Sequence, residues 1–119
     1  MNRDSSGMSP ETLRDYATAA LDELKARDQV CLCVNELTQM MDYMVVASGT
    51  SRRHVKALAD NVVEALRKLG QRPLGVEGDN ITGWILVDFG DVVVHVMSEE
   101  ARNFYELEKL WSMRPETGA

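Results

Sequence analysis

Hydrophobic and polar positions repeat along this chain with two periods, one helical and one extended. The first helical stretch begins at Ser9 and Pro10, an N-cap residue and a first-turn proline, and ends near Asp28. A second helix is predicted over residues 52–69, where Gly70 stops it. Apolar residues recur at helical spacing in both stretches, which predicts one buried stripe on each helix. The stripes are Leu13, Ala17, Ala20, Leu21 and Leu24 in the first helix, and Val55, Leu58, Ala59, Val62, Val63, Leu66 and Leu69 in the second.

Runs of apolar and β-branched residues between and after these helices predict strands. Residues 30–34 and 43–47 are apolar nearly throughout, which is typical of strands covered by helices on both faces. Residues 73–76 form a short third strand, and the proline at its start favours a sheet edge. Residues 84–89 and 92–97 are the last two strands.

The segment 84–111 is the most informative part of the chain, because a hairpin and an aromatic-rich helix follow one another in it. Gly90 and Asp91 separate the last two strands, and this pair tolerates the positive φ of a tight turn. Ser98 then caps a helix predicted over residues 99–111. The resulting order, αββαβββα, predicts an α/β (α+β mixed) fold, in which about five strands of one mixed sheet are flanked by helices in a single domain.

Length and composition agree with one globular domain. A chain of 119 residues, 45% of them apolar, can bury one core without metal or disulfides. We expect the domain to cover residues 9–112, between a flexible leader at 1–8 and a flexible tail at 113–119. No apolar run is long enough to span a bilayer, and the leader lacks the apolar segment of a secretion signal, so a cytoplasmic protein is predicted.

The charge and the cysteines limit the classes of ligand. A formal net charge of -6 disfavours direct contact with nucleic acid and suits a basic protein partner. Cys31 and Cys33 are expected on opposite faces of their strand as buried free thiols. With His54 and His95 as the only histidines and no second cysteine pair, neither a metal site nor a cofactor is predicted.

Several polar groups in the segment 84–111 lie where packing alone does not explain them. Asp88 and His95 interrupt the apolar hairpin, and His95 is expected to be half-buried and hydrogen-bonded rather than catalytic. Arg102 lies in the first turn of a helix, which is unfavourable for a cation, so it needs a partner. Asp88 or Asp91 within the chain, or a group on another protein, would serve. Trp84 fits a core residue and an exposed anchor equally well.

Trp111 and a basic cluster also have a structural interpretation beside a functional one. Trp111, in phase with the other apolar residues of the last helix, is expected in the core. The Arg52-Arg53-His54 cluster at the start of the second helix is interpreted as solvated, although contact with RNA is the alternative.

Four blocks of the sequence carry a family pattern in order. They are residues 42–51 with Arg53-His54-Val55, then Glu77-Gly78, then residues 84–96, and finally Arg102 with residues 104–111. Together they resemble the Iojap family, known in bacteria as ribosomal silencing factor RsfS, over roughly residues 13–112. The resemblance implies a compact α/β domain with a mixed sheet of nucleotidyltransferase-like topology and no known catalytic activity.

The resemblance also implies a partner and a mechanism. Family members bind the large ribosomal subunit through its fourteenth protein, where the small subunit would join, and so repress translation under nutrient limitation. A basic ribosomal protein would meet Asp88, Glu106 and Glu108, while Trp84 and Tyr105 would supply aromatic anchors. Such an aromatic surface also favours a symmetric homodimer.

Two other functions remain as alternatives. A nucleotidyltransferase-like enzyme is suggested by the Gly-Thr-Ser segment 49–51 ahead of a helix. Two-metal phosphoryl transfer needs paired carboxylates on the following strand, and residues 72–76 contain none. Glu77, Asp79 and Asp88 are not expected to form that pair. A ribosome biogenesis or assembly adaptor, using the same surface for another partner, is the second alternative.

Overall fold

A computed structural model describes residues 8–34, 41–79 and 81–105, with side chains described as far as Arg102. In this part of the chain, five strands form one mixed sheet in the order β1-β2-β5-β4-β3. The strands are β1 (Arg27–Cys33), β2 (Tyr43–Gly49), β3 (Gly75–Asp79), β4 (Trp84–Asp88) and β5 (Val92–Ser98), and the helices are α1 (Pro10–Glu23), α2 (Arg52–Arg67) and α3 (Glu99–Tyr105). The predicted αββαβββα order and mixed five-stranded sheet are confirmed.

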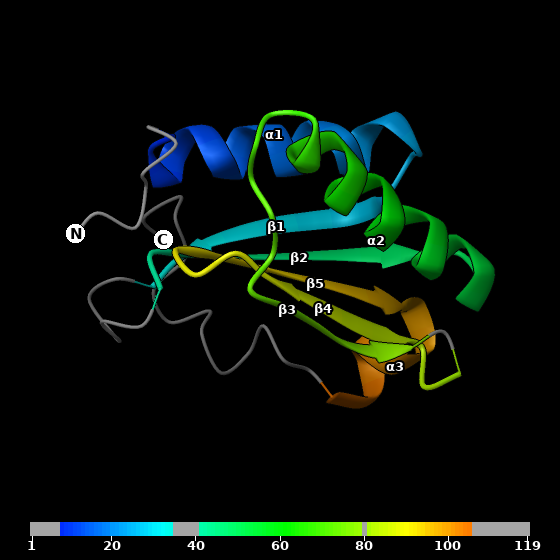
Figure 1. Ribbon diagram of the computed structural model, residues 1–119. Helices are drawn as coiled ribbons and strands as arrows, with labels where there is room; N and C mark the ends of the chain where they lie inside the picture. The colour runs from blue at the N-terminus through cyan, green and yellow to red at the C-terminus, as the bar shows by residue number, and fades with distance from the viewer. Residues whose placement is uncertain (1–7, 35–40, 80, 106–119) are drawn as a thin grey trace.

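Helices cover both faces of this sheet. The central strands β2 and β5 pair in parallel, and every other neighbouring pair is antiparallel. α1 and α2 lie side by side over one face, whereas α3 lies against the opposite face (Figure 1). We call these the helical face and the α3 face. β2 is buried along its whole length, as predicted, but β1 is an edge strand with partly exposed residues.

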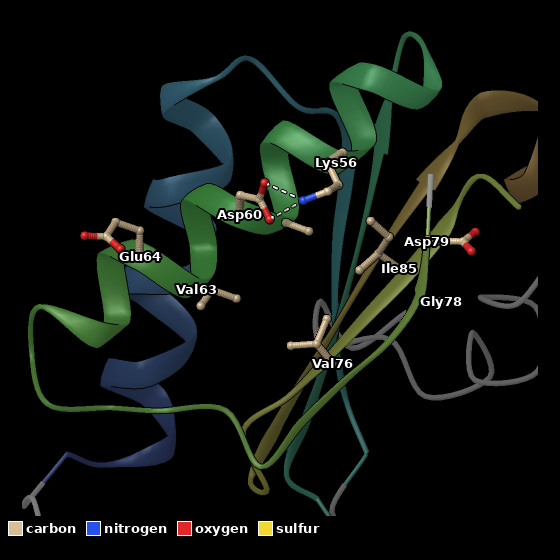
Figure 2. Close-up of a pocket in the computed structure, with 9 residues that line it drawn as sticks. Lys56, Asp60, Val63, Glu64, Val76, Gly78, Asp79 and Ile85 are labelled. Atoms are coloured by element: carbon tan, nitrogen blue, oxygen red, sulfur yellow. Dashed lines mark hydrogen bonds and ion pairs between the residues drawn. The ribbon is translucent and has the colours of Figure 1, made fainter. Parts of the chain in front are cut away.

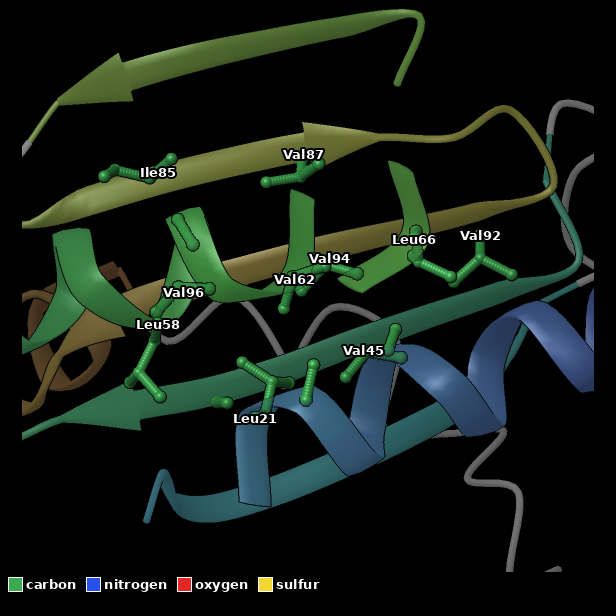
Figure 3. Close-up of a cluster of buried hydrophobic side chains, with 14 of the residues drawn as sticks. Leu21, Val45, Leu58, Val62, Leu66, Ile85, Val87, Val92, Val94 and Val96 are labelled. Carbon is green, nitrogen blue, oxygen red and sulfur yellow. The ribbon is translucent and has the colours of Figure 1, made fainter. Parts of the chain in front are cut away.

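The main core lies between the helical face and the two long helices. Leu21 of α1 and Leu58 and Val62 of α2 point into the same apolar layer as the valines of β2 and β5 (Figure 3). Each such fully buried side chain stabilises the fold by about 1.5–3 kcal/mol. The predicted stripes are buried except Val63, which is partly buried, and Leu24 and Leu69, which are exposed because they lie beyond the last turns of their helices.

The two helix ends show where the sequence was and was not informative. Gly70 has φ +82° beyond α2, and Gln71 N–H donates to the Leu66 carbonyl, as in a Schellman cap. α1 ends in the same motif, because Ala26 N–H donates to the carbonyl of Leu21. There, however, the left-handed position is occupied by Lys25, with φ +62°. Without a glycine to mark it, the predicted end near residue 28 was too late.

The hairpin is confirmed, and one prediction for the cysteines is wrong. Gly90 adopts φ +92° and Phe89 N–H donates to the Val92 carbonyl, which closes the tight turn. Cys31 and Cys33 do not lie on opposite faces. Both pack against the core of the helical face as partly buried free thiols, because residues two apart on a strand share a face.

The third strand begins and ends later than predicted. Gly78 allows it to continue pairing as far as Asp79. Gly78 has φ +86°, which an L side chain rarely adopts. A Cβ placed on it would lie 2.1 Å from the carbonyl oxygen of Trp84. The two backbones therefore approach more closely than any side chain would allow, at the point where the strand pairs with β4.

Replacing Gly78 by Ala should therefore lower the free energy of unfolding by about 2–4 kcal/mol, since both the positive φ and the close approach are lost. Gly75→Ala is the matched control, because Gly75 begins the same strand and a Cβ there meets nothing within 4 Å. Urea denaturation followed by circular dichroism would measure both. Equal stability of the two variants would contradict this explanation of Gly78.

Candidate partner-binding face

β4 presents alternate residues to the two faces of the sheet. Ile85 and Val87 are buried toward α2, whereas Trp84, Leu86 and Asp88 lie on the α3 face and are partly buried. Trp84 packs against the smaller apolar cluster on that face. This cluster contains Leu32, Val34, Met44, Val46, Met97 and Ala101. The α3 face thus combines a buried apolar centre with a partly accessible indole.

A hydrogen bond orients this indole. Trp84 Nε1–H donates to Nδ1 of His95 on the neighbouring strand at 3.0 Å, and the ring centroids lie 5.8 Å apart at 42°. Because an indole nitrogen only donates, His95 accepts at Nδ1, and its neutral ring carries the proton on Nε2. Trp84 is therefore neither a fully buried core residue nor a freely rotating surface anchor. His95 is buried and hydrogen-bonded, so the prediction that it is bonded to a neighbour is confirmed.

Burial also determines the charge of His95. The ring is 5% exposed, and desolvation lowers its pKa from 6.5 to about 4. Protonation at Nδ1 would in addition remove the acceptor for Trp84. His95 is consequently neutral near pH 7, and the pair stays hydrogen-bonded.

The stability of the fold should depend on pH through this residue. Between pH 6.5 and 4 the unfolded chain binds more protons at His95 than the folded chain does, so the free energy of unfolding falls as the pH is lowered. At pH 4.5 the loss from this group should be on the order of 2–3 kcal/mol relative to pH 7.

His95→Gln keeps an acceptor for Trp84 but does not titrate. Urea denaturation at pH 7 and pH 4.5 should therefore show a smaller pH-dependent loss in this variant than in the unchanged protein, while the carboxylates affect both alike. If the two proteins lose the same stability, His95 does not carry the effect.

Asp88 occupies the other end of β4. Its Oδ1 accepts a hydrogen bond from Gly90 N–H at 2.8 Å, so one carboxylate oxygen stabilises the hairpin turn. Asp88 lies four positions after Trp84 along the extended strand, which corresponds to roughly 13 Å. The two residues share a face but do not form a compact group.

The other predicted partner-binding residues are described less fully. Tyr105 ends α3, and its side chain is outside the described part. Glu106 and Glu108 lie outside the described residues, as do Trp111, the leader residues 1–7 and the tail 113–119. Ser98 does cap α3 as predicted, since its Oγ accepts from Ala101 N–H at 3.1 Å. Met8, assigned to the leader, packs against the main core.

The structure corrects the predicted partners of Arg102. Its Nη1 donates to the buried hydroxyl of Ser48 at 2.9 Å and to the carbonyl of Asp28 at 2.5 Å. Ser48 lies beside Met97 in the sheet register, whereas Asp88 and Asp91 lie at the hairpin end. Arg102 thus links α3 to β1 and β2, an arrangement that sequence spacing could not reveal because it joins residues 54 and 74 positions apart.

Removing these bonds should weaken the fold. Arg102→Met keeps an unbranched apolar stem but leaves the buried Ser48 hydroxyl without its guanidinium donor, and we expect a loss of about 1–3 kcal/mol in the free energy of unfolding. Arg52→Met, at an exposed position in α2, is the control and should change stability by less than about 0.5 kcal/mol. Thermal denaturation of both variants would test this, and equal melting temperatures would contradict the role given to Arg102.

The basic cluster at the start of α2 contains one structural residue. Thr50 N–H donates to Nδ1 of His54 at 2.9 Å, so the proton of the neutral ring is on Nε2, which donates to the Leu24 carbonyl at 2.7 Å. His54 therefore connects the start of α2 to the end of α1. Arg52 and Arg53 are exposed, which agrees with the solvated interpretation.

The carboxylates of β3 differ partly from expectation. Because the strand extends to Asp79, Glu77 and Asp79 share its α3 face with one residue between them. Asp79 Oδ1 accepts backbone hydrogen bonds from Ile81 and Thr82, which stabilises the following turn. In the described ranges, no three His, Cys, Asp or Glu side chains are grouped to hold a metal ion.

Taken together, the mixed sheet with helices on both faces defines a single-domain α/β protein in which the α3 face carries an ordered, partly accessible indole. None of the described helices has the length and apolar character needed to cross a membrane.

The chain matches the family model described as "Ribosomal silencing factor during starvation" over residues 7–118, and it belongs to this family, RsfS. It is 41% identical to ribosomal silencing factor RsfS of Haemophilus influenzae over 100 residues, which cover 84% of this chain and 98% of the relative.

Other relatives extend the similarity to organelles and to solved structures. A mouse protein, named mitochondrial assembly of ribosomal large subunit protein 1, is 38% identical over 84% of this chain and 45% of its own length. A crystal structure from Chromobacterium violaceum superposes with a TM-score of 0.85 at 41% identity and covers 88% of both chains. The predicted family and fold are confirmed.

Proposed function

We propose that this protein binds the large ribosomal subunit through its fourteenth protein and prevents the small subunit from joining, which represses translation under nutrient limitation. Membership of the ribosomal silencing factor family is the observation that carries the proposal. The mechanism requires only that a surface be occupied, so we infer that the protein acts without catalysis. The bacterial relatives favour a cytoplasmic location.

The charge of the chain supports a basic partner. At a formal net charge of -6, the protein repels the phosphate backbone of RNA and attracts a basic ribosomal protein, with little direct contact to nucleic acid. Complementary charge raises the association rate and orients the partners, and its effect weakens as salt is added.

We assign the binding surface to the α3 face. Trp84 is the central anchor in this proposal, because an indole already oriented by His95 loses little conformational freedom on binding. Asp88 lies at the far end of β4, and Tyr105, Glu106 and Glu108 belong to the end of α3 and the segment after it. The proposal thus gives the surface an aromatic anchor and a polar rim, the division found at other protein interfaces.

Binding can be measured by sedimentation of the protein with purified large subunits. Trp84→Ala should weaken binding by more than about 2 kcal/mol, or roughly 30-fold. Because Trp84 also contacts the apolar cluster, Trp84→Phe is tested beside it, and denaturation must show that both variants are folded. Light scattering of subunit mixtures should show that the unchanged protein lowers the amount of joined ribosomes.

Charge-reversal variants test whether binding depends on this surface or only on the net charge of the protein. Glu106→Lys with Glu108→Lys should weaken binding and reduce its salt dependence, whereas Asp15→Lys, at an exposed site on α1, should have little effect. Full binding by folded Trp84→Ala together with full binding by the Glu106 and Glu108 variants would refute the placement on the α3 face.

A role in ribosome assembly is the second candidate. It is favoured by the mouse relative, whose name refers to assembly of the mitochondrial large subunit. The two functions differ in the sedimentation profile of cells lacking the protein. Loss of silencing should leave mature large subunits that join too readily during starvation, whereas loss of assembly should leave incomplete large subunits during growth. A homodimer through the same α3 face would compete with ribosome binding in either case.

A further inference from the structure

A groove runs between α2 and the edge strand β3 on the helical face, away from the α3 face. It has a volume of about 430 Å³. Its lining residues are Lys56, Ala59, Asp60, Val63, Glu64, Val76, Gly78, Asp79 and Ile85. In Figure 2 the apolar side chains of α2 and of the two strands face one another across it.

The floor of the groove is apolar although it is open to solvent. Val76 is 50% exposed, because β3 is the last strand of the sheet and α2 packs mainly over the central strands and β4. Val63 and Ile85 lie on the other two sides of it (Figure 2). Leu74, just before the strand, is 77% exposed. Apolar residues thus continue along the edge strand beyond the groove.

The strand beside the groove has an open edge. In the described part of the chain β3 pairs with β4 alone and ends the strand order, so its outer backbone N–H and C=O groups face away from the sheet. Such an edge accepts an added strand, whose backbone then pairs while alternate side chains enter the neighbouring pocket.

The charged residues beside the groove lie on two elements. On α2 the acids are ion-paired, Asp60 with Lys56 at 2.8 Å. Glu64 pairs with Arg67 at 2.7 Å, and that hydrogen bond lowers the pKa of Glu64, so it stays ionised. On β3, Glu77 and Asp79 are exposed and point to the α3 face, so the net negative charge beside the open edge comes from this strand.

We propose that the α2–β3 groove binds an extended, basic peptide segment of a protein partner. The segment adds to the outer edge of β3 and places alternate apolar side chains against Val63, Val76 and Ile85. Because successive side chains of a strand point to opposite faces, its cationic side chains then lie beside Glu77 and Asp79. The groove itself lies across the sheet from Trp84, so the proposal goes beyond the function proposed above.

Fluorescence anisotropy with a labelled short peptide of alternating Lys and Val would test the site on the full chain. The peptide should bind, and its affinity should fall as salt is added. A peptide of alternating Glu and Val should bind at least about tenfold more weakly. The Lys-Val peptide with N-methyl groups on alternate backbone nitrogens should lose binding to a similar degree, because it cannot pair with a strand edge.

Substitutions test whether the peptide binds in the groove. Val76→Lys, at a half-exposed position, should weaken binding about tenfold or more, while Tyr16→Lys makes the same kind of change at an exposed site on α1 and should change it less than about twofold. Glu77→Gln with Asp79→Asn, which leaves the floor intact, should weaken binding and flatten its salt dependence. Circular dichroism would confirm that each variant is folded.

Three results would overturn the proposal. Equal affinity for the N-methylated peptide would exclude strand addition, and full affinity in folded Val76→Lys would exclude the groove. Equal affinity for the Glu-Val peptide would exclude charge complementarity. Sedimentation of the protein alone supplies a separate check: self-association abolished by Val76→Lys would make a second copy of this chain, rather than a basic peptide, the occupant.

Discussion

The parallel pairing of β2 and β5 at the centre of the sheet is the constraint on which the other elements depend. Parallel strands need both faces covered, because neither face can be left to water when the strands are apolar throughout. β2 is buried along its whole length, and β5 nearly so. α1 and α2 cover one face of the sheet, and α3 lies against the opposite face. The contrast between the two faces, and hence the position of each candidate surface, follows from this central pair.

Local chemistry predicted most of this fold, and long-range contacts account for what it missed. The stripes of α1 and α2, the turn at Gly90 and the cap at Ser98 each rest on residues a few positions apart, and all are present. The end of α1 was misjudged because Lys25 takes the left-handed conformation usually given to glycine. The length of β3 was misjudged because Gly78 permits contact with a backbone that comes later in the chain.

The candidate surfaces were predictable to different degrees. Asp88 and His95 could be singled out because they interrupt an apolar run. The predicted turn also sets the hairpin register, but it does not determine the side-chain orientations that bond Trp84 to His95. The partners of Arg102 could not be predicted either, because a backbone carbonyl and a hydroxyl carry no charge that would mark them in the sequence. The α2–β3 groove was not predicted at all. Its signal would have been a valine that alternates with acidic residues in a strand expected to be an edge.

His54 shows that residue type alone misstates the chemistry at the start of α2. Three adjacent basic residues suggest a cationic patch, yet one of them is a neutral connector that accepts at one ring nitrogen and donates at the other. Few side chains present an acceptor and a donor on opposite sides of a rigid ring. Lysine or arginine in its place would keep the formal basicity of the segment and lose the link between the two long helices. At this position ring geometry, rather than charge, is the property that a substitution would have to preserve.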